Sequence, residues 1–380
     1  MQLGRVLALS AGHFINDMYV GFLAPLLPFI INKLDISLTL AAGLTSILAV
    51  FTSLAQPVFG HIADKIRHPF FPILGPLLTA CAFGLIGYAN SYTALVVIII
   101  FGGIGTAAFH PQSASLVGKT SGRQGGLAMS IFVTGGSAGY YVGPVVIMSI
   151  VTWLGLKYSI ISIIPGVAVF IILFALLPEL PYSPRHHSRI NGHFVIPHQY
   201  RAILFLFLIS VLRSFTISGF NTFIPIYLEK QNVAPMMFAA ALTVFGLPGA
   251  VGALIAGGLS DRFGRKKIMF ASMASALLFL YLFLYFDGIL SMVCLGVAGF
   301  SMFMSIPVVI ITAQELFPGR VNTVSSVVMG FSWGIGGVLV TPLGALAELV
   351  GIQTALSLLT GCCALSLIFI LFTPETKRVT

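Results

Sequence analysis

Five polar or ionisable side chains lie inside long apolar stretches of this sequence, where burying them is costly. Asn16 and Asp17 follow His13 by three and four residues, so the three side chains share one face of a helix. His110 lies in a second apolar stretch and Arg213 in a third. Because an ionisable group in a bilayer core costs several kcal/mol, its presence there indicates a functional site.

Asp17 is the expected proton carrier, assisted by His13 or His110, and Arg213 is expected to bind an anionic group of a substrate. Asp17 lies about eleven residues, or roughly 16 Å, from the nearer end of its apolar stretch, which places it near the middle of a bilayer. Arg213 has almost the same depth. Two alternatives stay open: Asp17 is only a structural partner of Arg213, and His110 is only a buried core residue. The other expected substrate contacts are Asn16, Gln112, Tyr140 and Asn221.

The composition requires that these side chains stand on membrane-spanning helices. Of the 380 residues, 58% are hydrophobic and 8% are charged, whereas soluble domains have about 25% charged residues. A soluble enzyme and a disordered chain are therefore both excluded. A helix needs roughly 20 apolar residues to cross a bilayer. Twelve such stretches fit, at 6–31, 39–62, 70–89, 93–116, 126–152, 158–177, 201–228, 236–259, 267–286, 290–313, 323–347 and 352–372.

The basic residues indicate how these spans are oriented. With the N-terminus in the cytoplasm, fifteen of the 19 lysines and arginines fall in inner loops and tails, and three fall in outer loops. Such a bias marks the cytoplasmic side, so both termini and the linker 178–200 are predicted to be cytoplasmic. The net charge of +9 is spread thinly between apolar runs and does not predict nucleic-acid binding. The four cysteines lack metal-ligand or disulfide spacing, and we predict no metal and no cofactor.

The two halves of the sequence repeat each other. Two parallel six-helix repeats with a site between them are typical of transporters. We therefore predict an all-α membrane protein of two pseudo-symmetric six-helix bundles, 1–177 and 201–380, joined by the linker 178–200. Adding 197 to a residue number connects the matched positions, which are Asn16 and Arg213, Pro28 and Pro225, Gly60 and Gly257, and Asp64 and Asp261.

A glycine and an acid at fixed spacing begin the loop after the second span and the loop after the eighth. The glycine, one turn before the acid, lets a neighbouring helix approach closely. The acid can bind a helix N-terminus or a base and release it when a gate opens. A solvated basic loop would explain the bases but not the repeated spacing. Glu315 is expected to pair with an inner-loop base, in a gate rather than in proton coupling. The expected gating residues are Gly60, Asp64, Lys65, Arg123, Gly257, Asp261, Arg262, Gly264, Arg265, Glu315 and Arg320.

The repeated loop resembles the most specific signature of the major facilitator superfamily. The resemblance narrows to the fosmidomycin-resistance family of bacterial exporters, and it implies the major facilitator fold and a proton-driven efflux pump of the inner membrane. Two features depart from the pattern. The residue near Ile99 is apolar where many proton-coupled drug exporters have an arginine, and the first loop ends in Arg67-His68 without the full basic triplet. The narrower resemblance rests on HFINDM at 13–18, QPVFG at 56–60, FHPQS at 109–113 and AQELFPGR at 313–320.

Glycines at four-residue spacing mark the fifth span. Gly135, Gly139, Gly143 and the adjoining Pro144 predict close packing against another helix. The stripe resembles the antiporter motif of exporters in this superfamily, and packing with no bearing on transport direction is the open alternative. The range 135–139 also matches the G-x-S-x-G motif of hydrolases. That motif requires a strand–turn–helix with a histidine and an acid, which the middle of a membrane helix does not offer.

The sequence therefore predicts a secondary transporter that exchanges protons for a small organic molecule or drug, including anionic compounds such as phosphonates. Its expected location is the bacterial inner membrane, its partners are protons, substrate and lipid, and a monomer suffices for the architecture. The main alternative is an importer of a small organic anion, which Arg213 would also suit. A membrane-embedded hydrolase would need a nucleophile and a base at one depth, and Ser137 with His110 lacks an acid to orient the base. A channel would need a pore lined by repeated filter groups, which two such halves do not offer.

Overall fold

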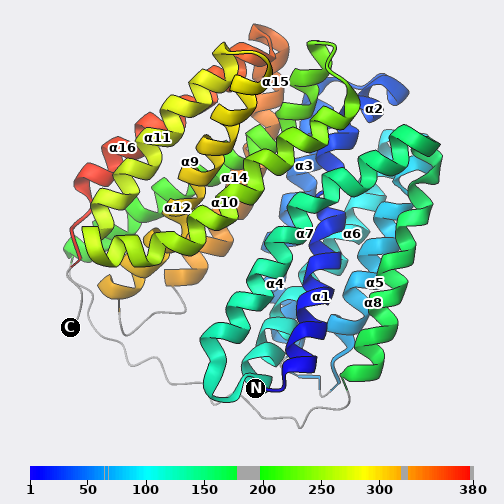
Figure 1. Cartoon of the computed structure of the whole chain (residues 1–380), viewed down its shortest axis with the longest axis horizontal. Helices are drawn as coiled ribbons and strands as arrows, with labels where there is room; N and C mark the ends of the chain where they lie inside the picture. Colours follow the sequence, from blue (N-terminus) through cyan, green and yellow to red (C-terminus); the bar gives the residue numbers. More distant parts are fainter. Residues whose placement is uncertain (64, 67, 178–196, 318–323, 377–380) are drawn as a thin grey trace. The chain divides into compact units, whose positions relative to one another are not determined.

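The computed structural model describes residues 1–63, 65–66, 68–177, 197–317 and 324–376, and this part of the chain is built from helices joined by short turns (Figure 1). Helices form because an apolar chain in hydrocarbon must satisfy its backbone N–H and C=O groups within the segment itself. The α-helices are, in chain order, α1 (Leu3–Val20), α2 (Leu23–Leu34), α3 (Leu38–Ala49), α4 (Gln56–Ala63), α5 (Phe70–Gly84), α6 (Tyr92–Thr120), α7 (Gly125–Leu154), α8 (Ile163–Leu176), α9 (Pro197–Lys230), α10 (Pro235–Phe263), α11 (Arg265–Tyr285), α12 (Gly288–Leu316), α14 (Ser332–Val338), α15 (Val340–Val350) and α16 (Ile352–Phe372).

Within the described residues, 12 helical segments are long and apolar enough to cross a membrane. The first of them runs over Leu3–Leu34 and includes both α1 and α2. The predicted boundaries agree closely: the span predicted at 352–372 is Ile352–Phe372, and the span predicted at 93–116 continues to Thr120. Such extensions arise because a helix continues into the aqueous layer as long as its backbone bonds are favourable. The prediction of an all-α, twelve-span membrane protein is confirmed.

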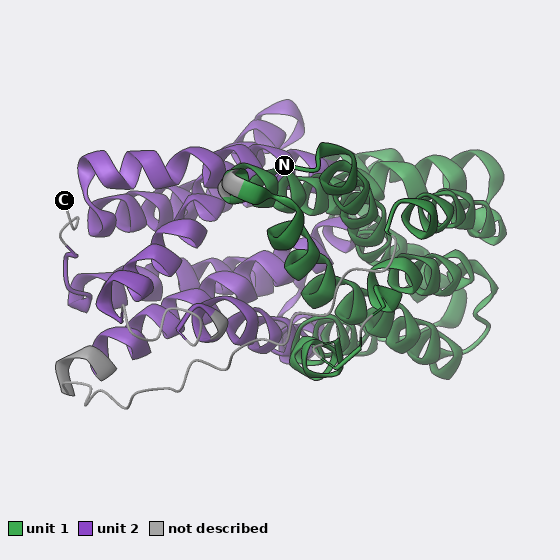
Figure 2. Cartoon of the chain, turned by 90° about the horizontal axis from the view of Figure 1, so that it is seen from below, with its two compact units in different colours: residues 1–188, 228–240 green, residues 189–227, 241–380 purple. Residues whose placement is uncertain are grey.

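Two compact units divide the chain (Figure 2). The first comprises residues 1–188 together with 228–240, and the second comprises residues 189–227 and 241–380. The end of α9 and the start of α10 therefore group with the first unit, in which Asn32 donates a hydrogen bond to Oε1 of Glu229 over 3.1 Å. Most of the predicted linker lies outside the described residues, so the division at 178–200 remains a prediction.

Helix α1 lies directly against α7 in the first unit. The two backbones touch because glycines on α7 face carbonyl oxygens on α1 at the same four-residue spacing. A Cβ at Gly135 would lie 2.8 Å from the main-chain oxygen of Ser10. A Cβ at Gly139 or Gly143 would overlap the α1 backbone. The glycine stripe therefore has a packing role, and Pro144 is buried beside it in α7. The three contacts are Gly135 with Ser10, Gly139 with Phe14, and Gly143 with Met18.

An apolar cluster holds α1, α6, α7 and α8 together. Phe109 of α6 and Phe132 of α7 stack at a centroid distance of 6.2 Å, and both are buried. Val6 and Leu9 of α1 and Leu173 of α8 complete the same cluster. Inside a bilayer such side chains stabilise the contact through close van der Waals packing and not through removal of apolar surface from water. The cluster thus fixes where α1 and α6 present the polar residues that follow Leu9 and Phe109.

Candidate functional site

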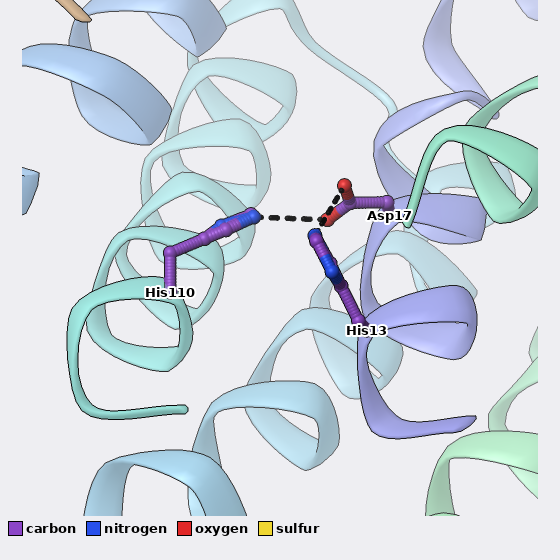
Figure 3. A group of neighbouring side chains, drawn as sticks. All are labelled: His13, Asp17 and His110. Atoms are coloured by element: carbon purple, nitrogen blue, oxygen red, sulfur yellow. Dashed lines mark ion pairs between the residues drawn. The ribbon is translucent and has the colours of Figure 1, made fainter. Parts of the chain in front are cut away.

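Two histidines flank the carboxylate of Asp17 in the first unit (Figure 3). His13 lies one turn before Asp17 on α1, and its Nε2 is 3.1 Å from Oδ2 of Asp17. His110, on α6, brings its Nε2 to 3.2 Å from Oδ1. The exposed fractions of the three side chains are 11%, 18% and 21% for His13, Asp17 and His110, so the group is largely withdrawn from solvent. The fold thus brings together the three residues that the sequence predicts as proton carriers.

A second layer of hydrogen bonds orients Asp17. Asn16 donates from Nδ2 to Oδ1 of Asp17 over 3.0 Å, and its own Oδ1 accepts from the Thr79 hydroxyl over 3.1 Å. Asn16 and Thr79 are both fully buried. Tyr140, on α7, interacts electrostatically with Asp17. Asn16 therefore uses both ends of its amide within the protein, and its contact with a substrate remains a prediction.

The cluster also has the donor atoms of a cation site. Two ring nitrogens and a carboxylate oxygen lie within 4.8 Å of one another, which is a spacing that could hold a metal ion. A proton between His13 and Asp17 would satisfy the same two atoms, because 3.1 Å is an ordinary hydrogen-bond distance. Nothing in the geometry requires a metal rather than a proton.

His110 is less well satisfied than His13. Its Nε2 approaches Asp17 without the alignment of a hydrogen bond, and within the described part of the chain neither ring nitrogen has a hydrogen-bond partner. The rings of His110 and His13 meet edge to face, with centroids 4.9 Å apart. A buried polar atom without a partner is destabilising. His110 is therefore the member of the cluster with most to gain from rotating or from taking up a proton.

Gln112 connects two helices instead of facing open space. Its Nε2 donates to the carbonyl oxygen of His68 over 3.1 Å, and its Oε1 accepts from the Phe71 backbone N–H over 3.1 Å. Both ends of the amide are thus engaged at the start of α5. The predicted substrate contact of Gln112 would require one of these bonds to break. Asn221 differs, because its side chain is 6% exposed and its Oδ1 has no hydrogen-bond partner among the described residues.

Arg213 is the most deeply buried charged side chain among the described residues of the second unit. Its side chain is 1% exposed, and its Nε and Nη1 have no hydrogen-bond partner within the described residues. The hydroxyls of Ser210 and Ser214, on the same helix α9, are buried and unpartnered as well. A buried charge without a partner costs several kcal/mol, so this arrangement calls for an anion that completes it. The expected pairing of Arg213 with Asp17 remains a prediction.

An ion-pair network joins α10, α11 and α12 in the second unit. Nη2 of Arg265 lies 2.7 Å from Oδ1 of Asp261 and 2.9 Å from Oε1 of Glu315. Nη1 of Arg265 donates to the Ser260 hydroxyl over 2.5 Å, and the Thr376 hydroxyl donates to Glu315 over 2.5 Å. Glu315 therefore pairs with a base of the inner loop. This network can lock the loop, and its role in a gate remains a prediction.

The other predicted gating residues differ in what surrounds them. Gly264 has a φ of +100°, which only glycine adopts readily, and it is the single residue between the end of α10 and the start of α11. The Arg262 guanidinium lies 5.3 Å from the Phe263 ring. Lys65 is exposed. Asp64, Arg320 and the side chain of Arg123 lie outside the described residues.

The close helix approach predicted at the loop glycines is wrong for this conformation. A Cβ at Gly257 would meet no described atom within 4 Å. A Cβ at Gly60 would lie 3.5 Å from Pro111 of α6, which is an ordinary contact. Among the described residues, the space beside Gly257 would therefore accept a methyl group, so the lack of a side chain at this position has no steric role in this structure.

Sequence reasoning missed three contributors to the site. The Thr79 hydroxyl donates to Asn16, the Phe132 carbonyl oxygen lies 2.7 Å from Nδ1 of His13, and Gly136 lies directly against the His13 ring. Thr79 is a polar residue in an apolar span, which was a usable signal. A main-chain carbonyl carries no sequence signal at all. Gly136 stands among the glycines of α7, and spacing alone does not distinguish it from those that face the α1 backbone.

These features together define an integral, multi-pass membrane transporter: twelve spans with ionisable side chains buried inside them. The sequence profile of the Major Facilitator Superfamily matches residues 9–341 and 206–380. The chain belongs to this superfamily, whose members are transporters and not enzymes.

Known relatives narrow the similarity. The chain is 26% identical to the fosmidomycin resistance protein of Escherichia coli, over 96% of this chain and 90% of that protein. It is 24% identical to the MFS-type transporter YfnC of Bacillus subtilis, over 96% and 91%. It is also 24% identical to the multidrug resistance protein MdtG of Salmonella paratyphi A, over 71% and 70%. The predicted resemblance to the fosmidomycin-resistance family is confirmed.

Solved structures show the same fold. The nucleoside transporter NupG aligns with a TM-score of 0.78 at 15% identity, covering 97% of this chain and 98% of that chain. An inward-facing, unoccupied bacterial homologue of the human lysosomal transporter Spinster aligns with a TM-score of 0.74 at 15% identity, covering 97% and 95%. At this identity the likeness establishes the major facilitator fold alone.

Proposed function

We propose that this chain is a proton-coupled antiporter that exports a small organic molecule or drug, anionic compounds such as phosphonates among them, across a bacterial inner membrane. The observation that carries the proposal is the carboxylate of Asp17, buried in a span and held between His13 and His110. Three titratable groups in contact inside the membrane can take up and release a proton there. A purely structural role would leave the free-energy cost of placing these ionisable groups inside the membrane uncompensated.

The second unit supplies the reason for an anionic cargo. Arg213 is buried with two guanidinium nitrogens unpartnered among the described residues, so a carboxylate or phosphonate would complete its hydrogen bonds. In the proposed cycle the proton occupies the Asp17 cluster and the anion occupies Arg213. If Arg213 bound either Asp17 or the cargo but not both at once, the proton and the cargo would compete. Such competition is the minimum that an antiporter needs.

The relatives support export over other directions. The names of two of them state resistance to fosmidomycin and to multiple drugs, and resistance follows from moving a compound out of the cell. Ile99, the apolar position in the fourth span where many proton-coupled drug exporters have an arginine, is fully buried. Coupling in this chain is accordingly assigned to the Asp17 cluster.

The orientation belongs to the same proposal. Both termini and the linker 178–200 face the cytoplasm, because fifteen of 19 basic residues then lie inside. Single cysteines placed in a Cys-free background test this with an impermeant reagent. Labelling of a cysteine at position 187 from outside intact cells would overturn it.

An importer of a small organic anion is the second candidate function. The Nε and Nη1 atoms of Arg213, which lack partners among the described residues, favour it equally, since an anion site does not specify direction. The importer and the exporter differ in whether protons and cargo move together or oppositely.

One experiment decides between them. Purified protein is placed in liposomes with an imposed pH gradient, and a panel of phosphonates and lipophilic drugs is added in turn. Proton flux that starts only when a compound is added, with the compound moving against the proton, supports the antiporter. Movement in the same direction as the proton supports the importer, and compound movement indifferent to the gradient contradicts proton coupling.

A further inference from the structure

His13 is held by α7 from two sides. Its Nδ1 lies 2.7 Å from the carbonyl oxygen of Phe132, and its ring lies over Gly136, where any Cβ would overlap the imidazole. The Phe132 ring packs against the imidazole at a centroid distance of 4.2 Å. The His13 side chain is 11% exposed. The imidazole therefore occupies a slot that exists only because residue 136 has no side chain.

The Phe132 carbonyl determines which nitrogen of His13 carries hydrogen. A carbonyl oxygen only accepts, so Nδ1 must be the donor in this contact. A neutral imidazole with its hydrogen on Nδ1 has a lone pair on Nε2. That lone pair would face the carboxylate of Asp17 at 3.1 Å. Two lone pairs repel at this distance, whereas one proton between them makes a hydrogen bond.

We propose that Gly136 and the Phe132 carbonyl position His13 so that its contact with Asp17 closes only around one bound proton. This inference rests on the proposed function, because it specifies where the coupled proton is held. In the closed state either the imidazolium donates to the carboxylate or the carboxylic acid donates to the imidazole. When the proton leaves, the pair loses one positive charge, Nδ1 keeps its hydrogen, and the contact between Nε2 and Oδ2 opens.

The groups around the pair can stabilise the Asp17 carboxylate after its proton has left. On α6, Nε2 of His110 lies 3.2 Å from the other oxygen of Asp17. On α1, Asn16 already donates to that oxygen, and from α7 Tyr140 interacts with the same charge. Loss of the proton would therefore shift Asp17 toward His110 while His13 stays attached to α7. Gly136 touches neither proton nor cargo, and it is a positioning residue that acts through His13.

The test is Gly136→Ala, with Gly135→Ala as its matched control. Both variants add one methyl group to α7 at a position that faces α1. The first displaces the His13 ring, which can swing aside, and the second crowds the Ser10 carbonyl at 2.8 Å without touching His13. Nitrogen-15 spectra of histidine-labelled protein in lipid, with the His13 signals assigned from their loss in His13→Gln, read the tautomer without any cargo.

In the wild type we expect His13 Nδ1 to stay protonated across the pH range while the Nε2 signal titrates. Gly136→Ala should admit the other neutral tautomer, change the pH profile of transport and lower proton-driven transport on the order of tenfold. Gly135→Ala, which crowds the Ser10 backbone, is expected to lower stability and transport but to keep the hydrogen of His13 on Nδ1. In the His13→Gln background, Gly136→Ala should add no further loss, because its effect passes through His13.

Unchanged His13 signals in Gly136→Ala would overturn the proposal, and so would a wild-type His13 that carries its hydrogen on Nε2 alone. If Gly136→Ala does not fold, the wild-type spectra decide by themselves. A wild type with the expected tautomer but without proton-driven transport would refute the proposed function and leave the positioning of His13 standing.

Discussion

The matched positions 16 and 213 show how the two units differ. In the first unit, Asn16 is buried with both ends of its amide bonded, to Thr79 and to Asp17. In the second, Arg213 is buried to the same degree, yet two of its nitrogens lack partners within the described residues. Asn16 is thus satisfied within its own unit, although His110 beside Asp17 is not, and Arg213 would gain its missing partners from an anion.

This difference indicates that the two repeats share a helical framework but divide the chemistry. A satisfied network rigidifies its surroundings, so the first unit can hold a proton at one defined place. An unsatisfied buried charge stores the desolvation cost that a ligand can relieve. We propose that the repeat supplies two matched positions, 16 and 213, and that the residue type at each decides which ligand it takes.

The largest expected effect is that of Asp17→Asn. Removing the titratable carboxylate should abolish transport driven by a pH gradient, by at least about 100-fold or 2.7 kcal/mol, while downhill exchange of cargo remains measurable. The measurement is proton release on cargo binding by detergent-solubilised protein, with Asp17→Glu as the variant that keeps a carboxylate. Proton release that persists in Asp17→Asn would place coupling elsewhere, with His110 as the first position to examine.

Arg213→Ala should come second. Loss of a charge-assisted hydrogen bond of about 1.5–3 kcal/mol should weaken binding of anionic compounds roughly 10- to 100-fold. Binding of neutral compounds should change little. Equilibrium binding of paired anionic and neutral analogues measures this, and Arg213→Lys keeps the charge but not the planar donor fork. Equal weakening of both analogues would argue that Arg213 supports the fold instead of the cargo.

Asp261→Asn should have a moderate effect on turnover and little effect on affinity. It removes one of the two carboxylates paired with Arg265, at 2.7 Å, and leaves the Glu315 pair at 2.9 Å in place. Ion pairs near a surface contribute about 1 kcal/mol or less, so we expect turnover to fall by about two- to fivefold. Initial rates over a range of cargo concentrations separate the two effects. Turnover at the wild-type level would count against a gate at this loop.

The last comparison is between a glycine that packs against a helix backbone, Gly139, and one with free space beside it among the described residues, Gly257. Gly139→Ala forces a methyl group into the Phe14 backbone and should destabilise the first unit by about 1–3 kcal/mol. Gly257→Ala meets no described atom within 4 Å and should leave stability unchanged or raise it by less than about 1 kcal/mol. Thermal unfolding in one detergent compares them directly. A destabilised Gly257→Ala would mean that a close approach occurs at this position in another state.

Local spacing and apolar length made several features predictable. His13 and Asp17 had to be neighbours once α1 was helical, because residues four apart lie on one face. The glycine stripe of α7 was recognisable as a packing surface. The same reasoning could not identify which helix it would face, and it assigned the loop glycine Gly257 a close contact that this conformation lacks.

Long apolar runs were sufficient to predict the membrane class and the twelve spans, since these follow from composition and periodicity alone. The family was reached differently, through the resemblance of the repeated loop and of four short motifs, and the superfamily profile then confirmed it. Only the tertiary structure brought His110 to Asp17, Thr79 to Asn16 and Glu315 to Arg265, which are separated by 93, 63 and 50 positions in the sequence. Spacing within a helix is local geometry, whereas a contact between helices depends on how their packed faces rotate and shift against one another. For the same reason the tautomer of His13 was decided by a backbone carbonyl on α7, a group that every residue possesses and that no sequence pattern singles out.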